Sequence, residues 1–260
     1  MNDLSYEVQG HIATILLNRP EHKNAFTIPM VNAWADALER AQHDDQVRAI
    51  LVAGAGGSFC SGVDLSDFKG EKRTPLQEKQ LLMDNVHRVA LTLEQVDKPV
   101  IAAIDGPAVG AGMDMALLCD IRFASPSARF SEGYIKVGLV PGDGGSWLLP
   151  RVVGHSTALR LLWTGDFVEA EDSARLGIVE YVVRDESVGD HARAFAQRLA
   201  EQPPQIIRMI KRAVRQGANH DLATALDLMS SHMAVITTTE DSKEAYAAFT
   251  ERRRAKFRGE

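Results

Sequence analysis

Two largely apolar runs that end in glycine, VRAILVAG (47–54) and PVIAAIDG (99–106), constrain the fold of this chain more than any other feature. Runs of this kind are typical of parallel strands that are buried on both faces of a sheet. The second run leads through a glycine-rich turn into an apolar helix at 110–120, and a third strand, IRFAS (121–125), follows. This alternation predicts an α/β fold with a mainly parallel sheet, outer helices and a ligand crevice beyond the strand ends.

The segments on either side of these strands predict a hairpin and several helices. Short β-prone runs at 6–8 and 12–17 flank Gly10 and predict an opening hairpin. Apolar residues at helical spacing predict helices over 27–42, with Thr27 as the N-cap, and over 76–96. After Pro203 and Pro204 the pattern is helical to the end, so we place a boundary near Gln202 and divide the chain into 1–202 and 203–260. A terminal helical layer without its own sheet must cover its apolar stripes on the core or on another subunit, which predicts oligomerisation.

Composition excludes several classes of protein. The 260 residues carry a net charge of −6, which argues against a nucleic-acid-binding surface, although the tail at 252–258 is locally basic. The only cysteines, Cys60 and Cys119, have no spacing that indicates a disulfide framework or a metal site. Neither a secretory signal nor an apolar run of membrane-spanning length is visible, so we expect a cytoplasmic protein without membrane partners.

Three glycine-rich segments carry the candidate chemistry. Residues 54–65 lack the patterns of a P-loop or a dinucleotide-binding turn. In 105–125 a glycine-rich turn enters a helix, whose first amides suit an anionic oxygen. Asp114 lies near that helix start, where a carboxylate also complements the helix dipole. Asp143 lies in the PGDGG turn of 128–154, and both an ordinary turn residue and a ligand-facing acid fit this position.

In their order and spacing these segments resemble the crotonase (enoyl-CoA hydratase/isomerase) family over nearly the whole chain. The resemblance rests on LNRPEHKNAF, SFCSGVDL, KPVIAAIDGPAVGAGMDMALLCDIRFAS, GLVPGDGGSWLLPRVVG and TGDFVEAEDSARLGIVEYVV. It implies a spiral of repeated ββα units in 1–202, and C-terminal helices in 203–260 that build a homotrimer or hexamer. It also implies an acyl-CoA thioester as substrate, with coenzyme A as part of that substrate and no separate cofactor.

The resemblance assigns two oxyanion-hole donors and a coenzyme A site. The backbone amides of Val63 and Ala111 match the donors that stabilise the thioester enolate, and such a donor is typically worth about 3 kcal/mol. The positions that match the coenzyme A contacts of the family are Lys23, Ala25, Ser61, Asp64 and Leu65, joined at a subunit contact by Phe249 and Arg252.

The acids depart from the family's hydratase pattern. Family hydratases hold their water with two glutamates, whereas Asp114 and Tyr134 occupy these positions here. Because tyrosine has a pKa near 10, it stays protonated at neutral pH and is a poor general base there. We therefore expect atypical chemistry shared by Asp114, Tyr134 and Asp143. In an extended segment Glu132 and Tyr134 would point to the same side, and whether Glu132 or His22 reaches the site stays open. Hydrolysis of a carbon–carbon bond in a β-diketone, by an acid with a histidine, and non-catalytic acyl-CoA binding are the alternatives.

Overall fold

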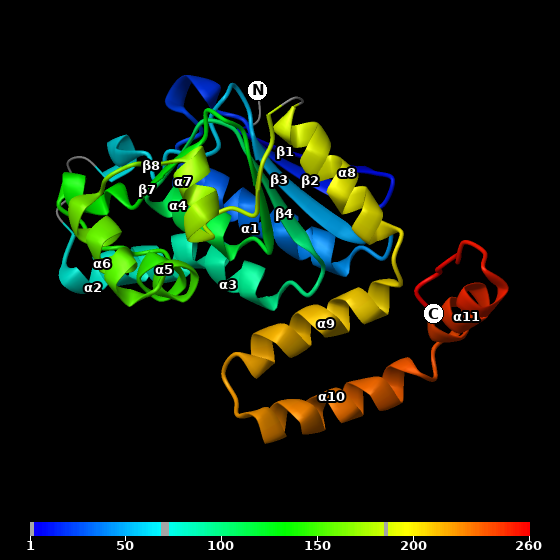
Figure 1. Ribbon diagram of the computed structural model, residues 1–260. Coiled ribbons are helices and arrows are strands. Elements are labelled where there is room, and N and C mark those ends of the chain that lie inside the picture. The colour runs from blue at the N-terminus through cyan, green and yellow to red at the C-terminus, as the bar shows by residue number, and fades with distance from the viewer. Residues whose placement is uncertain (1–2, 69–72, 185–186) are drawn as a thin grey trace.

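The computed structural model describes residues 3–68, 73–184 and 187–260, and its largest element is a six-stranded sheet (Figure 1). The strand order is β1-β2-β3-β4-β6-β9, and only the hairpin of β1 and β2 is antiparallel. These strands are β1 (Leu4–Gln9), β2 (Ile12–Leu17), β3 (Ala49–Gly54), β4 (Val100–Ile104), β6 (Ile121–Ala124) and β9 (Tyr181–Val182). The predicted hairpin and the three predicted buried strands are confirmed.

A smaller sheet of β5 (Pro107–Val109), β7 (Arg129–Ser131) and β8 (Val168–Glu169) forms a second layer. Cys60 joins it through an isolated bridge to Ala108. The chain passes from β4 to β5 and then into helix α4 (Ala111–Leu118), and it passes in the same way from β6 to β7 and into the 3₁₀-helix η4 (Gly133–Val137). This repeated path from one sheet to the other confirms the predicted α/β spiral.

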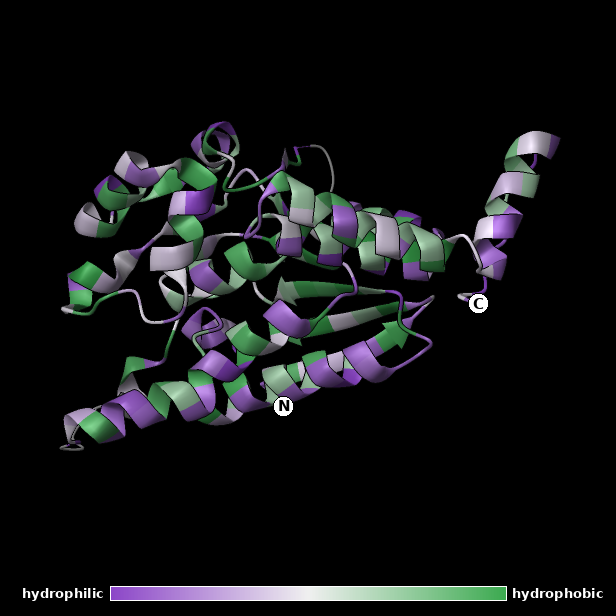
Figure 2. Ribbon diagram, turned by 90° about the horizontal axis from the view of Figure 1, so that it is seen from below, coloured by the Kyte–Doolittle hydropathy of each residue, from purple (hydrophilic) through white to green (hydrophobic). Residues whose placement is uncertain are grey.

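Strand β3 shows why the larger sheet must be covered on both sides. Ile50 and Val52 belong to one apolar core, which α1 (Ile28–His43), α3 (His87–Gln95) and α4 help to build. Ala49 and Leu51 belong to a second core beneath α8 (Val188–Ala200). All four residues are almost completely buried. Figure 2 accordingly shows mostly hydrophobic strands surrounded by helices whose residues alternate in hydropathy.

The three helices that were predicted in the first 202 residues are present, and one of them contains a turn that was not predicted. Thr27 caps α1 by accepting a hydrogen bond from the Met30 amide, as predicted. The predicted helix over 76–96 is confirmed as an unbroken helical segment from Pro75 to Gln95, but a π-helical turn, η3, lies in its middle. Leu82 and Val86 line a cavity, and Val86 also enters the core. The helices are α1 (Ile28–His43), α2 (Pro75–Leu81), η3 (Leu82–Val86), α3 (His87–Gln95), α5 (Gly145–Val153), α6 (His155–Thr164), α7 (Ala170–Leu176) and α8 (Val188–Ala200), with α4 and η4 as given above and short 3₁₀-helices η1 (Pro20–His22) and η2 (Leu65–Phe68).

The last three helices, α9 (Pro204–Gly217), α10 (Leu222–Ile236) and α11 (Glu240–Glu251), extend away from the spiral. Figure 1 shows α9 between the core and α10. Beyond α11 the chain folds back, and the amides of Arg258 and Gly259 donate to the Asp241 carboxylate at 2.7 and 2.8 Å. No helix of the described residues is long and apolar enough to cross a membrane.

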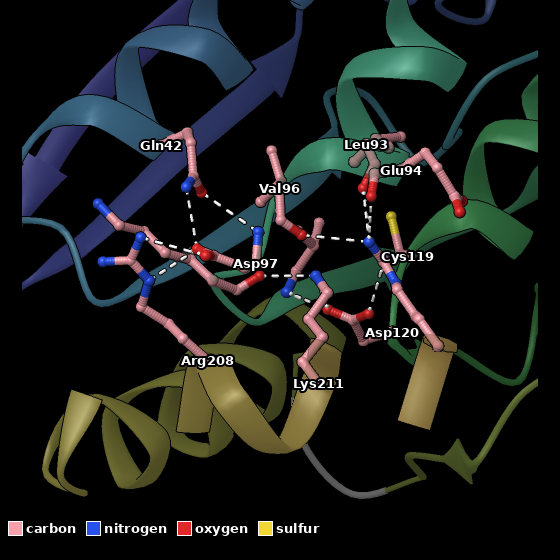
Figure 3. A network of polar contacts seen from close by, with 12 residues as sticks. Gln42, Leu93, Glu94, Val96, Asp97, Cys119, Asp120, Arg208 and Lys211 are labelled. Atoms are coloured by element: carbon pink, nitrogen blue, oxygen red, sulfur yellow. Dashed lines mark hydrogen bonds and ion pairs between the residues drawn. The ribbon is translucent and has the colours of Figure 1, made fainter. Parts of the chain in front are cut away.

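Charged side chains hold α9 on the core (Figure 3). No residue of α9 is fully buried. Instead, Arg208 and Arg212 pair with Asp97, which is 4% exposed, and Lys211 pairs with Asp120 at 2.6 Å. Lys211 also donates to the Lys98 carbonyl at 2.7 Å. The attachment of the C-terminal helices therefore depends on two carboxylates, the buried Asp97 and the partly buried Asp120.

We predict that Asp97→Ala lowers the free energy of unfolding by about 2 to 3 kcal/mol, because it leaves two guanidinium groups beside a site without its carboxylate. Asp36→Ala is the matched control, since Asp36 also pairs with an arginine, Arg88, but its side chain is 66% exposed. Such an exposed pair contributes at most about 1 kcal/mol. Urea unfolding measures both variants, and limited proteolysis reports release of 204–260. Equal effects of the two substitutions would contradict the anchoring role of Asp97.

Candidate active site

A cavity of about 430 Å³ opens between the α2–η3 segment and the segment that contains η4 and the turn after it. Its wall is mainly apolar, and Tyr134 and Asp143 contribute polar groups to it. Val63 and Leu65 lie on the same wall. The structure thus brings four of the predicted site residues to one cavity. The apolar side chains of the wall are Val63, Leu65, Leu82, Val86, Val137, Leu139 and Val140.

The segments that carry the two predicted oxyanion donors lie against each other. Gly62 has a φ of +90°, and a Cβ at this position would lie 2.9 Å from the Val109 carbonyl oxygen and 3.6 Å from the Ala111 amide nitrogen. Ala111 is the first residue of α4, where amides lack an intrahelical acceptor. Within the described part of the chain, neither the Val63 nor the Ala111 amide donates to a backbone carbonyl. Two amides on touching loops are therefore available to an acceptor.

Tyr134 links two buried carboxyl groups beside these loops. Its hydroxyl oxygen lies 2.6 Å from Asp114 Oδ2 and 2.9 Å from Asp143 Oδ2. Its ring packs on Gly110, the residue before Ala111. Asp114 is completely buried and is not part of the cavity wall, whereas Asp143 is. The three predicted catalytic residues therefore form one hydrogen-bonded chain with Asp143 and Tyr134 at the cavity and Asp114 behind them.

Burial raises the pKa of every member of this chain. It raises the pKa of Asp114 to about 7, and the charge of Asp143 adds to this effect. Burial also raises the pKa of the Asp143 carboxyl and of the Tyr134 hydroxyl. A carboxyl group with a pKa near 7, such as that of Asp114, can both give and take protons at the pH of a cell. The chain is therefore suited to proton transfer.

Two residues outside the predicted catalytic set also reach the chain. Glu132 is 1% exposed, and burial followed by the charge of Asp114 raises its pKa to about 10. It precedes the 3₁₀-helix η4 and does not lie in the extended segment that we expected. His87, at the start of α3, was missed; its Nε2 donates to the Gly142 carbonyl at 2.8 Å, and its charge lowers the pKa of Asp143. His22 is exposed on η1, and its carbonyl oxygen accepts from Ser61.

The predicted coenzyme A residues separate into two groups. In the first group the Ser61 amide donates to the Lys23 carbonyl at 3.0 Å, and Arg19 donates both to the Ala25 carbonyl and to the Asp64 carboxylate. This group adjoins the cavity through Leu65. The second group, Phe249 and Arg252, lies at the end of α11, which Figure 1 shows on the opposite side of the molecule from α2. One chain therefore does not bring the two groups together.

The carboxyl groups of Asp114, Glu132 and Asp143 do not form a metal site. Among the described residues, no group of three or more histidine, cysteine, aspartate or glutamate side chains is arranged to hold a metal ion. Paired amides beside a buried chain of carboxyl and hydroxyl groups are features of an enzyme site.

Comparisons with known proteins agree with this class. Residues 7–260 match the family model described as enoyl-CoA hydratase/isomerase. The chain is 36% identical to 1,2-epoxyphenylacetyl-CoA isomerase of Escherichia coli and 34% identical to short-chain-enoyl-CoA hydratase of Clostridium acetobutylicum, with at least 97% of each chain covered. The crystal structure of an enoyl-CoA hydratase of Mycobacterium smegmatis superposes with a TM-score of 0.93, at 30% identity over 99% of both chains. The chain therefore belongs to the enoyl-CoA hydratase/isomerase family, as its motifs predicted.

We predict that Gly145→Ala displaces the carboxyl groups of Asp114 and Glu132 and lowers the stability of the protein. A Cβ on Gly145 would lie 2.8 Å from Glu132 Oε2 and closer still to Asp114 Oδ1. Overpacking of this kind costs about 1 to 3 kcal/mol. Gly189→Ala is the control, since it also lies in the first turn of a helix, α8, but meets its nearest atom only at 3.5 Å. Thermal unfolding compares the two variants. A Gly145→Ala protein as stable as the Gly189→Ala protein would contradict the close packing of these carboxyl groups.

Proposed function

We propose that the protein is an acyl-CoA isomerase that moves a proton along the acyl chain through a thioester enolate. In this proposal the acyl group enters the cavity of about 430 Å³. The Val63 and Ala111 amides donate to the thioester oxygen, where negative charge develops. Lys23, Ala25, Ser61, Asp64 and Leu65 border the coenzyme A part of the substrate, and no separate cofactor takes part.

The hydrogen bonds of Tyr134 carry this proposal. Its hydroxyl contacts both Asp114 and Asp143, so these acids are linked to each other through a phenol. A hydratase needs two carboxyl groups free to hold and activate a water, whereas a proton-transfer enzyme needs one basic group at the substrate and a path for its proton. The linked acids of this site fit a proton-transfer enzyme better than a hydratase. The names of the relatives include both an isomerase and a hydratase and do not decide between the two reactions.

The proposed reaction balances without an added reactant. Asp143 takes the proton from the carbon next to the thioester, and the electrons of that C–H bond move into the enolate. The proton then returns to the far end of the conjugated system, and the double bond shifts. Because Asp143 borders the cavity and Asp114 does not, Asp143 meets the substrate while Asp114 exchanges protons with it through Tyr134.

One observation favours a second candidate, hydrolysis of a carbon–carbon bond in a β-diketone. His87 lies beside Asp143, which supplies the acid and histidine pair that such a reaction would use. The imidazole, however, donates to the Gly142 carbonyl, so it serves at least in part to position the turn. A substrate screen separates the two candidates.

We predict that a 3-enoyl-CoA is isomerised faster than crotonyl-CoA is hydrated, and that a β-diketone is not cleaved. Asp143→Asn should lower kcat about 100-fold, because it removes the base, and Tyr134→Phe should lower it less. Asp166→Asn, at an exposed position, is the control. Absorbance assays with each purified variant measure these rates. Fast crotonyl-CoA hydration or an unimpaired Asp143→Asn enzyme would refute the proposal, and tight thioester binding without any turnover would favour a non-catalytic homologue.

We further propose that three or six chains assemble through the C-terminal helices. Leu222, Leu226 and Met233 of α10 are each more than half exposed, as is Phe249 of α11. Exposed apolar residues of this density are typical of an interface. In such an assembly Phe249 and Arg252 would contact the coenzyme A that a neighbouring chain holds.

Sedimentation should therefore show a trimer or hexamer at micromolar concentration. We predict that Arg252→Ala leaves the assembly intact and raises the KM for a thioester several-fold, because a lost contact to a phosphate weakens binding but not chemistry. Arg254→Ala is the matched control, since Arg254 is 81% exposed and pairs with Glu201. A stable monomer would contradict both the assembly and the contact from a neighbour.

A further inference from the structure

The protons of the buried carboxyl groups can be counted from geometry. The Tyr134 hydroxyl has one proton, but its oxygen is within hydrogen-bonding distance of two carboxyl oxygens. It can donate to only one of them, so the other carboxyl group must itself carry a proton and donate to the tyrosine oxygen. At least one of Asp114 and Asp143 is therefore neutral.

Glu132 supplies a further carboxyl group to the same place. A Cβ on Gly145 would meet Asp114 Oδ1 and both oxygens of Glu132, so the two carboxyl groups lie against the same side of Gly145. These three oxygens are buried, and none has a hydrogen-bond partner in the described part of the chain. Buried polar atoms are rarely left unpaired. A proton on Glu132 that points to Asp114 Oδ1 satisfies both groups at once.

The charges around Glu132 favour its neutral form. Asp114 faces it from α4, Asp143 from the turn before α5 and Tyr134 from η4, while His87 of α3 acts on Asp143. Among the residues that the structure describes, no lysine or arginine forms an ion pair with any of the three carboxyl groups. His87 supplies at most one positive charge, beside Asp143, so three carboxylates cannot all be ionised at such a site.

We propose that Glu132 is a positioning residue whose carboxyl proton is donated to Asp114 Oδ1. The bond holds the Asp114 carboxyl group so that its Oδ2 stays on the Tyr134 hydroxyl. In the arrangement that isomerisation needs, Asp114 donates to Tyr134, Tyr134 donates to a negative Asp143, and Asp143 is a base at the cavity.

This device deepens the proposed isomerase and rests on it for its kinetic consequence. Asp143 takes a proton from the substrate and gives it back, so both aspartates are neutral while the enolate exists. A neutral Glu132 keeps Asp114 in place beside Tyr134 in both states, whereas an ionised Glu132 would repel the negative charge of the chain.

Two substitutions of similar size test the role of the donor. Glu132→Gln keeps an N–H donor toward Asp114, and we expect its kcat and pH profile to stay within about twofold of the wild type. Glu132→Met removes the donor, and we expect kcat to fall about tenfold, because the Asp114 carboxyl group is then no longer held toward Tyr134. A Gln variant as impaired as the Met variant would overturn the proposal.

Infrared spectroscopy tests the proton without any substrate. We expect the wild-type protein at pH 7 to show the C=O stretch of a neutral buried carboxylic acid, and this band to lose intensity in Glu132→Gln but not in Glu7→Gln, an exposed control on β1. An unchanged band would overturn the proposal, whatever the reaction is. Loss of the band in a protein that turns over no thioester would instead leave the proton on Glu132 and refute the isomerase.

Unfolding at several pH values gives a second substrate-free measurement. Burial raises the pKa of Glu132 to about 10, so the folded chain binds this proton more tightly than the unfolded chain does. The stabilisation is fully present below the ordinary glutamate pKa and is lost as the pH rises toward 10. We therefore expect Glu132→Gln to gain stability relative to the wild type between about pH 5 and pH 9. A constant difference across this range would contradict a protonated Glu132.

Discussion

The burial of the larger sheet on both faces is the constraint on which the site depends. Because helices cover both faces, ligands can approach the parallel strands only beyond their ends. Strands β3, β4 and β6 run in the same direction, so the segments that follow them leave from one edge of the sheet. Those segments carry Val63, Ala111 and Tyr134. The sheet thereby gathers residues that are up to 71 positions apart along the chain.

Features that depend on local pattern could be predicted from the sequence. The apolar runs at 47–54 and 99–106 are long enough to show burial on both faces, and Thr27 lies directly before a helical stripe. The loops around Val63 and Ala111 were found by their motifs, and the structure brings them into contact. The short strands β5, β7, β8 and β9 were not predicted, because two or three residues show no periodicity. The π-helical turn at η3 was missed since one extra residue per turn barely alters an apolar stripe.

Features that depend on contacts between distant segments could not be predicted. Asp114, Tyr134 and Asp143 were each identified by position, but nothing in the sequence indicates that one phenol bonds both acids. Strand alternation does not apply at Glu132, because a 3₁₀-helix begins at the next residue, Gly133. The Glu132 carboxyl group lies near Asp114 as a result. His87 lies 56 residues before Asp143, on a helix that showed only an apolar stripe. The sequence feature that best indicates a buried Glu132 is the glycine at 145, because the absence of a side chain there makes room for two carboxyl groups.

The ionic attachment of α9 also sets the angle at which the C-terminal helices leave the spiral. Apolar packing has no preferred direction, whereas Arg208, Lys211 and Arg215 must each meet a fixed oxygen on the core. These contacts resist both sliding and rotation of the helix. The orientation matters because the C-terminal helices are long: a tilt of about 10° would move the far end of a helix about 22 Å long by about 4 Å. Three polar contacts of α9 with the core thus fix the position of residues at the far end of the C-terminal helices.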